Sequence, residues 1–177
     1  MHRLFVALRP PLAVRQRLRA LMQGVQGARW QSEAQLHLTL SFIGEVDSHI
    51  AEEVARALDL IRRPPIAIRL DGVGSFASRG RPHSLYVRVA HSSDLTALHL
   101  AVQGALRRIG LSPDTRAFTP HITVARLPRT AGPIDRWLAD TAGLSEPPFT
   151  IDSFELYESE LGREGSIYHV ATRYALR

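Results

Sequence analysis

The stretch His37-Leu38-Thr39-Leu40 returns in nearly the same form as His121-Ile122-Thr123-Val124. Side chains on a β-strand alternate between its two faces, so in each stretch the histidine and the threonine project together while the apolar residues point the other way. We therefore interpret both stretches as strands with one polar and one buried face. Around the first stretch, four apolar side chains are predicted to face a core: Leu36, Leu38, Leu40 and Phe42.

The segments around these stretches follow one order twice: strand, helix, His-x-Thr strand, helix, strand. In the first half we expect these elements at 2–8, after Pro10-Pro11, at 36–43, after Asp47 or Ser48, and at 66–71. In the second half we expect them at 84–90, 93–109, 120–126, from Pro133, and at 149–157, with a closing strand at 167–175. The first helix is expected to carry the apolar stripe Val14, Leu18, Leu21, Met22 and Val25. The Gly-, Ser- and Arg-rich segment 72–83 is predicted to be a loop.

The two halves also match in spacing. The first histidine lies 33 residues after Leu4, and the second lies 35 residues after Tyr86. A repeated order with repeated spacing indicates an internal duplication. We therefore predict a single two-lobed domain over residues 1–177, with pseudo-repeats at approximately 2–71 and 84–157 and an approximate two-fold axis between the lobes.

The composition is that of a soluble globular protein, with 45% apolar and 22% charged residues among 177. No apolar run approaches the ~18 residues of a membrane span, and Pro10-Pro11 interrupts the amino-terminal segment before a signal-peptide core forms. We expect a cytoplasmic protein without membrane contact, and a monomer, because no exposed apolar stripe is evident. The absence of cysteine excludes disulfides, thiolate ligands and a thiol nucleophile. A net charge of +5 favours anionic partners.

Two His-Thr pairs facing one cleft suit attack at phosphorus. In-line displacement places the nucleophile and the leaving group on opposite sides of phosphorus, so it needs a base on one side and an acid on the other. Two imidazoles can supply both near neutral pH. The hydroxyls of Thr39 and Thr123 can donate to the equatorial phosphate oxygens, where negative charge accumulates. This chemistry needs neither a metal nor a cofactor.

Other readings of the sequence are weaker. Metal sites usually place two or three ligands within a few residues, and no such set of histidines and carboxylates occurs. Gly72-Val73-Gly74 lacks both the third glycine of a dinucleotide fingerprint and the Lys-Ser/Thr of a P-loop. One His-x-Thr segment alone would more often be structural, and the same holds for the six remaining histidines, at 2, 49, 83, 91, 99 and 169.

Arginines and aromatic residues near the two stretches allow two interpretations. Arg126 is a candidate phosphate ligand, but strict alternation places it on the face opposite His121 unless the strand ends or bulges. The arginines at 79, 81 and 116 form either a basic rim for RNA or ordinary solvated loops. Phe42, Trp30 and Tyr157 are expected in the core rather than as platforms for bases.

These residues resemble those of the two-histidine (2H) phosphoesterases, and among them the RNA 2′,3′-cyclic phosphodiesterases historically called 2′-5′ RNA ligases. The resemblance covers nearly the whole chain. It rests on residues 3–8, Trp30, 36–45, 72–76, 118–126, 156–161 and Tyr168. At Gly165-Ser166 the chain departs from the family, which commonly has proline after this glycine.

The resemblance implies an α+β fold with two lobes, in which mostly antiparallel sheets line a central cleft and helices lie outside. It implies hydrolysis of the 2′,3′-cyclic phosphate at an RNA end to a 2′-phosphomonoester. His37 would be the proton donor to the departing 3′ oxygen, and His121 the proton acceptor from water. In the reverse direction, family members join tRNA halves through a 2′-5′ bond without ATP.

Two alternatives remain at this point. The first is a related two-histidine activity on small cyclic phosphates or 2′-5′ oligonucleotides. The second is an RNA-binding module without catalysis, for which the net positive charge would be the main reason.

Overall fold

A computed structural model describes the whole chain, residues 1–177. It contains four α-helices and ten strands. The helices are α1 (Leu12–Arg19), α2 (Ser48–Asp59), α3 (Ser93–Arg108) and α4 (Asp135–Thr141), and Glu33–Gln35 forms one 3₁₀ turn. The strands are β1 (His2–Leu8), β2 (Arg29–Trp30), β3 (Leu38–Val46), β4 (Ile66–Ile68), β5 (Leu70–Ser78), β6 (Arg81–Val89), β7 (His121–Arg126), β8 (Phe149–Ile151), β9 (Ser153–Gly162) and β10 (Gly165–Ala175).

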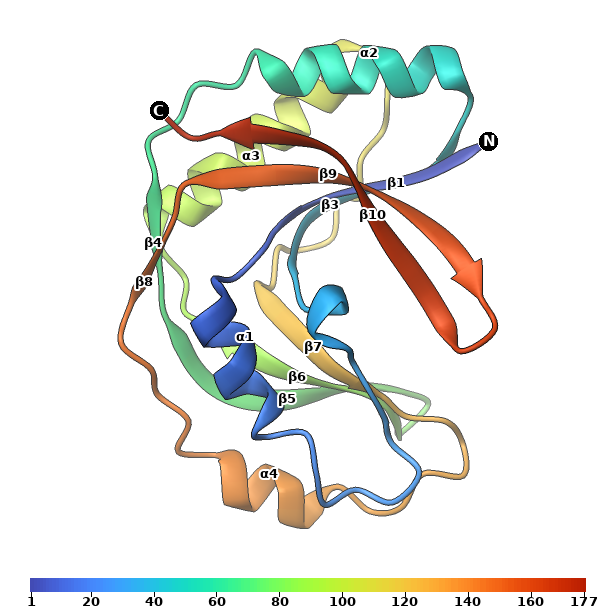
Figure 1. Cartoon of the computed structure of the whole chain (residues 1–177), viewed down its shortest axis with the longest axis vertical. Helices are drawn as coiled ribbons and strands as arrows, with labels where there is room; N and C mark the ends of the chain where they lie inside the picture. The colour runs from blue at the N-terminus through green and yellow to red at the C-terminus, as the bar shows by residue number, and fades with distance from the viewer.

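The main sheet is antiparallel and consists of two parts that barely touch. Its order is β10-β9-β1-β3-β7-β6-β5, with β2 added beside β7 (Figure 1). The pairing of β3 with β7 consists of one residue pair, Leu38 with Ile122, after which the two strands diverge. Strands β4 and β8 form a separate two-stranded sheet. The predicted α+β class with antiparallel sheets is confirmed, and the two parts of the main sheet meet at the two His-x-Thr segments.

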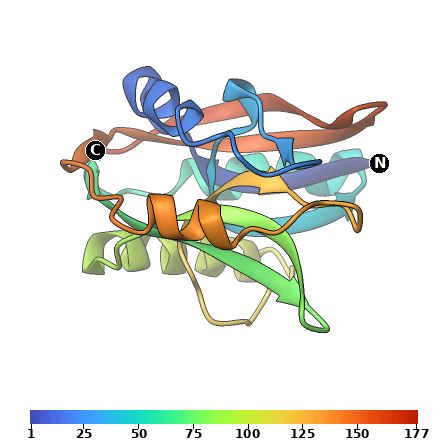
Figure 2. The ribbon, with the colours of Figure 1, turned by 90° about the horizontal axis from the view of Figure 1, so that it is seen from below.

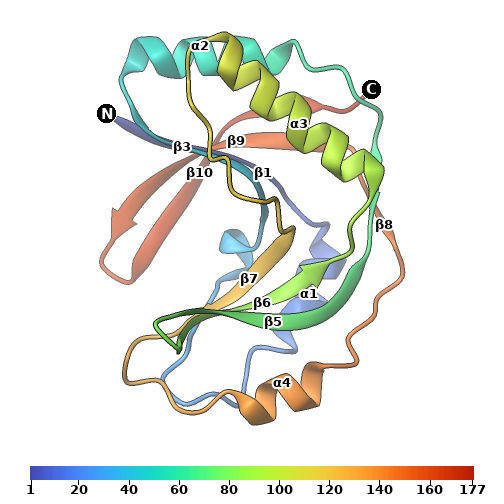
Figure 3. The ribbon, with the colours of Figure 1, turned by 180° about the vertical axis from the view of Figure 1, so that it is seen from behind.

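Helices cover the outer side of each part. Helices α2 and α3 lie together behind β1 and β3, and α4 lies at the opposite end of the molecule near β5 (Figures 1 and 3). Seen from below, α1 and α3 lie on opposite sides of the strands, and α4 lies in front of them (Figure 2). None of the four helices combines the length and the apolar character that a membrane-crossing helix requires. The predicted order of strand, helix, strand, helix, strand occurs in both halves of the chain.

The capping residues explain where the two longest helices begin. The side chain of Asp47 accepts a hydrogen bond from the amide of Ile50 at 2.9 Å, and the side chain of Ser92 accepts one from the amide of Leu95 at 3.1 Å. Such bonds satisfy amides that have no partner within the helix. The predicted starting points of α2 and α3 are therefore confirmed.

Three predicted elements differ from the structure. The first helix ends at Arg19 rather than continuing to Val25. The amides of Ala20, Leu21 and Met22 bond carbonyls three residues earlier, so the helix closes in a tightened turn, and Gly24, with a φ of +86°, then takes the chain out of the helical region. Segment 72–83 is not a loop. It belongs to a hairpin of β5 and β6, whose turn at Arg79-Gly80 has positive φ at both residues, as a type I′ hairpin turn requires. The strands predicted at 66–71 and 149–157 are each divided into two.

Candidate active site

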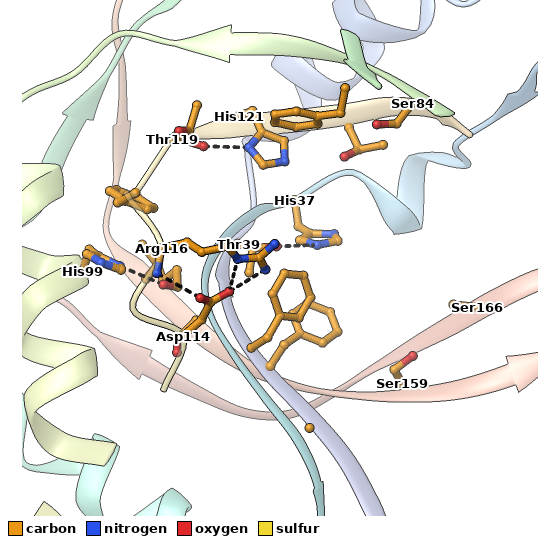
Figure 4. Close-up of a pocket in the computed structure, with 18 of the residues that line it drawn as sticks. His37, Thr39, Ser84, His99, Asp114, Arg116, Thr119, His121, Ser159 and Ser166 are labelled. Atoms are coloured by element: carbon orange, nitrogen blue, oxygen red, sulfur yellow. Dashed lines mark hydrogen bonds and ion pairs between the residues drawn. The ribbon is translucent and has the colours of Figure 1, made fainter. Parts of the chain in front are cut away.

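A cavity of about 860 Å³ lies where the two parts of the main sheet diverge. His37, Thr39, His121 and Thr123 all line it. The first three are labelled in Figure 4. The two histidines come from opposite parts of the sheet, and their imidazoles face the same space. The structure therefore brings together the four side chains that the paired motifs predict as one site.

The ring of His37 is held at both nitrogens. Its Nδ1 donates to the carbonyl oxygen of Gln35 at 2.7 Å, which leaves Nε2 as the nitrogen with the free lone pair in the neutral ring. Nε2 lies 3.1 Å from Oγ1 of Thr39. Phe5 and Tyr168 pack against the ring, with centroid distances of 4.9 and 5.2 Å. The carbonyl thus fixes the tautomer, and the aromatic rings fix the plane of the imidazole.

The ring of His121 is held by one hydrogen bond and two aromatic contacts. Its Nδ1 donates to the carbonyl oxygen of Thr119, two residues earlier, at 2.7 Å. Phe76 contacts the ring edge-on with a centroid distance of 4.8 Å, and Tyr86 lies at 5.3 Å. Each histidine therefore donates through Nδ1 to the backbone and keeps Nε2 available for chemistry.

Burial makes both imidazoles poor cations in the free protein. It lowers the pKa of His37 from 6.5 to about 4; the hydrogen bond to Gln35 opposes this effect, and the nearby charge of Arg126 adds to it. Burial also lowers the pKa of His121, where the hydrogen bond to Thr119 again opposes the effect and Arg126 again adds to it. Both rings are consequently neutral near pH 7 in the free protein.

A β-bulge follows the threonine in each motif. In the pairing of β1 with β3, Ala7 lies opposite Thr39 and Val6 lies opposite Ser41, so Leu40 is the additional residue. In the pairing of β6 with β7, Val124 is the additional residue in the same way. A bulge of one residue reverses the alternation beyond it. The residue five positions after each histidine therefore returns to the face of the cavity.

This reversal corrects one prediction and decides the placement of another residue. Phe42, which follows His37 by five positions, does not face the core; it is 59% exposed and lines the cavity. Arg126, which follows His121 by five positions, also lines the cavity. The bulge that Arg126 needed in order to reach the cleft is therefore present, while its role as a phosphate ligand stays a prediction.

The family model of the 2′-5′ RNA ligase superfamily matches residues 10–163. The chain belongs to this superfamily. A relative from Archaeoglobus fulgidus named RNA 2′,3′-cyclic phosphodiesterase is 29% identical over 173 residues, covering 94% of this chain and 96% of the relative. A relative of the same name from Thermotoga maritima is 33% identical over 156 residues, covering 85% and 80%.

Two solved structures have the same fold as this chain over almost its whole length. A crystal structure of a Thermus thermophilus protein superposes with a TM-score of 0.85 at 25% identity, covering 99% of this chain and 98% of the other. The structure of Escherichia coli LigT complexed with 3′-AMP superposes with a TM-score of 0.80 at 26% identity, again covering 99% and 98%. The chain thus shares its whole fold with both of these proteins.

Sequence reasoning assigned no role to the aromatic side chains that pack against the two imidazoles, namely Phe5, Phe76, Tyr86 and Tyr168. It also missed Ser84, which is fully buried, lines the cavity and has an Oγ without a hydrogen-bond partner. These residues are separated from the motifs in sequence and meet them only through the pairing of strands. Their signal is the register of neighbouring strands, which a single sequence does not give.

The other residues singled out from the sequence lie either at the cavity or in the core. His99 and His83 line the cavity; His99 donates through Nδ1 to the carbonyl of Leu40 and stacks on Phe118 at 4.0 Å. Arg116 also lines the cavity but is paired with Asp114 (Figure 4). Tyr157 is buried as predicted, and Trp30 is partly buried against the core. Nowhere in the chain are three or more His, Cys, Asp or Glu side chains grouped so that they could hold a metal ion.

Proposed function

We propose that the chain hydrolyses the 2′,3′-cyclic phosphate at the end of an RNA to a 2′-phosphomonoester by two-histidine acid-base catalysis without a metal. The observation that carries the proposal is the matched anchoring of His37 and His121. Each ring donates through Nδ1 to a carbonyl two residues earlier, and both rings line one cavity. This is the arrangement that an in-line displacement with one base and one acid needs.

The chain is a cyclic phosphodiesterase. Its relatives from Archaeoglobus fulgidus and Thermotoga maritima carry the name RNA 2′,3′-cyclic phosphodiesterase and match it over 94% and 85% of its length. The structure of LigT, which shares this fold, is a complex with 3′-AMP. A terminal nucleotide is a ligand of suitable size for a cavity of about 860 Å³.

In the proposed step, a water oxygen attacks phosphorus while Nε2 of His121 accepts its proton. The bond between phosphorus and the 3′ oxygen breaks, and Nε2 of His37 gives its proton to that oxygen. The products are a 2′-phosphomonoester and a free 3′ hydroxyl. The step ends with His121 protonated and His37 neutral, so exchange with solvent must restore both rings before the next turnover.

The bound substrate favours the protonated form of His37 that this step requires. His37 must be protonated to act as a donor, yet burial and the charge of Arg126 keep its pKa low in the free protein. The negative charge of the bound phosphate opposes both effects and raises the pKa of His37. Thr39, Thr123 and Arg126 line the cavity as donors for the phosphate oxygens, and they stabilise the charge that accumulates in the transition state.

We include ligation in the proposal. An RNA fragment that ends in a 2′,3′-cyclic phosphate, such as a tRNA half, is joined through a 2′-5′ bond when the 5′ hydroxyl of a second fragment takes the place of water. This reaction needs no ATP, because the cyclic phosphate already holds the energy of the strained diester. The same Nε2 atoms transfer the same two protons.

The test is incubation of an RNA bearing a 2′,3′-cyclic phosphate with the protein in EDTA, followed by chromatographic separation of the 2′- and 3′-phosphate products. We expect turnover to the 2′-phosphate in EDTA and loss of at least ~100-fold in His37→Ala and in His121→Ala. His49→Ala is the matched control, because His49 is an exposed histidine paired only with Glu53. Full activity in His37→Ala or in His121→Ala, or binding of RNA without turnover, would contradict the proposal.

A further inference from the structure

Gln35 makes three hydrogen bonds that meet around the ring of His37. Its carbonyl oxygen accepts from Nδ1 of His37 at 2.7 Å. Its side-chain Oε1 accepts from the amide of Ser32 at 2.9 Å, and its Nε2 donates to the carbonyl oxygen of Ser166 at 2.7 Å. The side chain is half-buried, and its two polar atoms bind main-chain groups of two separate segments. Gln35 therefore joins the support of His37 to β10, at a residue 131 positions away along the chain.

The two ends of this connection support one imidazole from different sides. Ser166 and Tyr168 are two positions apart on β10, so their side chains project from the same face, and both line the cavity. The ring of Tyr168 packs edge-on against His37 with a centroid distance of 5.2 Å and an interplanar angle of 89°. It also packs against Phe5, which contacts the same imidazole. The Gln35 side chain thus fixes the turn that supplies the carbonyl relative to the strand that supplies Tyr168.

The part of β10 that carries Ser166 and Tyr168 lies at the edge of the sheet. β10 is the outermost strand and pairs only with β9. The pairing of β9 with β1 stops at Glu158, so residues 159–168 form a two-stranded hairpin that projects beyond the sheet (Figure 1). A hairpin of two strands is by itself marginally stable. Apart from the ladder between its own strands, this segment has one hydrogen bond to the rest of the chain, the bond from Gln35 to Ser166.

The surroundings of His121 are fixed in a different way. Its Nδ1 also donates to a carbonyl two residues earlier, that of Thr119. The ring of Tyr86 packs against it from β6, and β6 is paired directly with β7, the strand that carries His121 itself. The two histidines are thus anchored alike at Nδ1. Strand pairing holds the surroundings of His121 together, whereas one glutamine side chain does so for His37.

We propose that Gln35 is a positioning residue for the acid of the reaction. By holding the carbonyl and Tyr168 in a fixed relation, its side chain maintains the Nδ1–H tautomer of His37 and keeps Nε2 directed into the cavity. Nε2 is the atom that gives its proton to the departing 3′ oxygen in the proposed step. The inference rests on the proposed function for the identity of the acid, whereas the tautomer of His37 is measured without any substrate.

The first test replaces Gln35 by methionine, which has nearly the same length but neither the donor nor the acceptor. Nitrogen NMR spectra of the imidazoles, recorded above the pKa of both rings, distinguish the two neutral tautomers. We expect a mixture of tautomers at His37 in Gln35→Met, with His121 unchanged in the same spectrum. Gln23→Met is the matched control, because Gln23 is exposed and its side chain makes no hydrogen bond. It should leave both rings unchanged.

Steady-state kinetics identify which proton is affected. With a cyclic phosphate substrate, kcat of Gln35→Met should fall by about 10-fold with little change in KM, as expected for a displaced catalytic group. A substrate in which sulfur replaces the departing 3′ oxygen needs no proton from His37, because a thiolate leaves unprotonated. On this substrate, Gln35→Met should turn over at the rate of the unmodified protein. A residue with a merely structural role would lower kcat on both substrates alike.

A second variant, Gln35→Glu, separates the two side-chain bonds, because a carboxylate still accepts from the Ser32 amide but cannot donate to the Ser166 carbonyl. It should show the same mixture of tautomers, and it replaces Gln35→Met in the test if that variant does not fold. An unchanged Nδ1–H tautomer of His37 in either variant, or an equal loss of kcat on the oxygen and sulfur substrates, would overturn the inference. If the unmodified protein turns over no substrate, the proposed function fails, and the tautomer of His37 still decides the role of Gln35.

Discussion

The acid sensitivity of the fold should depend on His37. This imidazole is neutral in the folded protein because burial lowers its pKa from 6.5 to about 4. In the unfolded chain it ionises near its ordinary value, so between these two pKa values protons bind the unfolded chain in preference to the folded one. The stability that the neutral ring contributes is therefore present above pH 6.5 and is lost as the pH falls toward 4.

The size of this effect follows from the difference between the two pKa values. The full difference corresponds to about 3 kcal/mol, of which about 2 kcal/mol is lost by pH 5. Glutamine at position 37 keeps an amide able to donate to the carbonyl of Gln35 and does not titrate. The free energy of unfolding of the unmodified protein should thus fall by about 2 kcal/mol relative to His37→Gln between pH 7.5 and pH 5.

Urea denaturation of both proteins at a series of pH values measures this difference directly. All other titrating groups are common to the two proteins, so their contributions cancel to first order. A difference in unfolding free energy that stays constant from pH 7.5 to pH 5 would refute the reasoning, because it would mean that His37 ionises equally in both states.

Three further predictions concern residues around His37 and His121. Arg126→Gln should raise the pKa of both imidazoles in the free protein, since its charge lowers both, and NMR titration of the ring protons would detect a shift in either direction. Gly74→Ala should reduce kcat by about 10-fold, because a Cβ there would lie 2.5 Å from the hydroxyl of Tyr86 and would displace the ring that packs against the second histidine. Gly143→Ala, where a Cβ meets nothing within 4 Å, is the control, and equal kinetics of the two variants would exclude this support role. Thr39→Val should lower kcat by about 10- to 100-fold with little change in KM, which steady-state kinetics would show; an effect on KM alone would assign the hydroxyl to ground-state binding.

The chemistry of the site could be predicted from the sequence because it depends on the alternation of side chains within two short strands. Within His37-Leu38-Thr39 and His121-Ile122-Thr123, a period of two is enough to place histidine and threonine on one face. The caps of α2 and α3 are equally local, since Asp47 and Ser92 bond amides three residues away. In each case the relevant interaction spans only a few residues of the chain.

What the sequence did not reveal depends on pairing between distant strands. The bulges at Leu40 and Val124 exist only in register with β1 and β6, and they decide that Phe42 and Arg126 face the cavity. The same holds for Ser84, whose place at the cavity is set by its partner on β7, Arg126. Strand register arises from the packing of the whole sheet, so a single sequence gives no direct sign of it.

Composition misled the interpretation of residues 72–83. Glycine, serine and arginine are typical of loops, yet here they form two sides of a hairpin. Gly74 lies within a strand, and glycine is needed there because the ring of Tyr86 covers the backbone and leaves no room for a Cβ. Only Arg79 and Gly80 adopt the positive φ values of a turn.

The central claim is that His37 donates a proton to the departing 3′ oxygen and His121 accepts a proton from water. It is tested most directly by a substrate in which sulfur replaces the departing 3′ oxygen. A thiolate leaves without receiving a proton, so this substrate does not need the acid but still needs the base. We predict that it restores kcat of His37→Ala to within about 10-fold of the unmodified protein and leaves His121→Ala inactive. Restored turnover in His121→Ala instead, or in neither variant, would contradict the assignment.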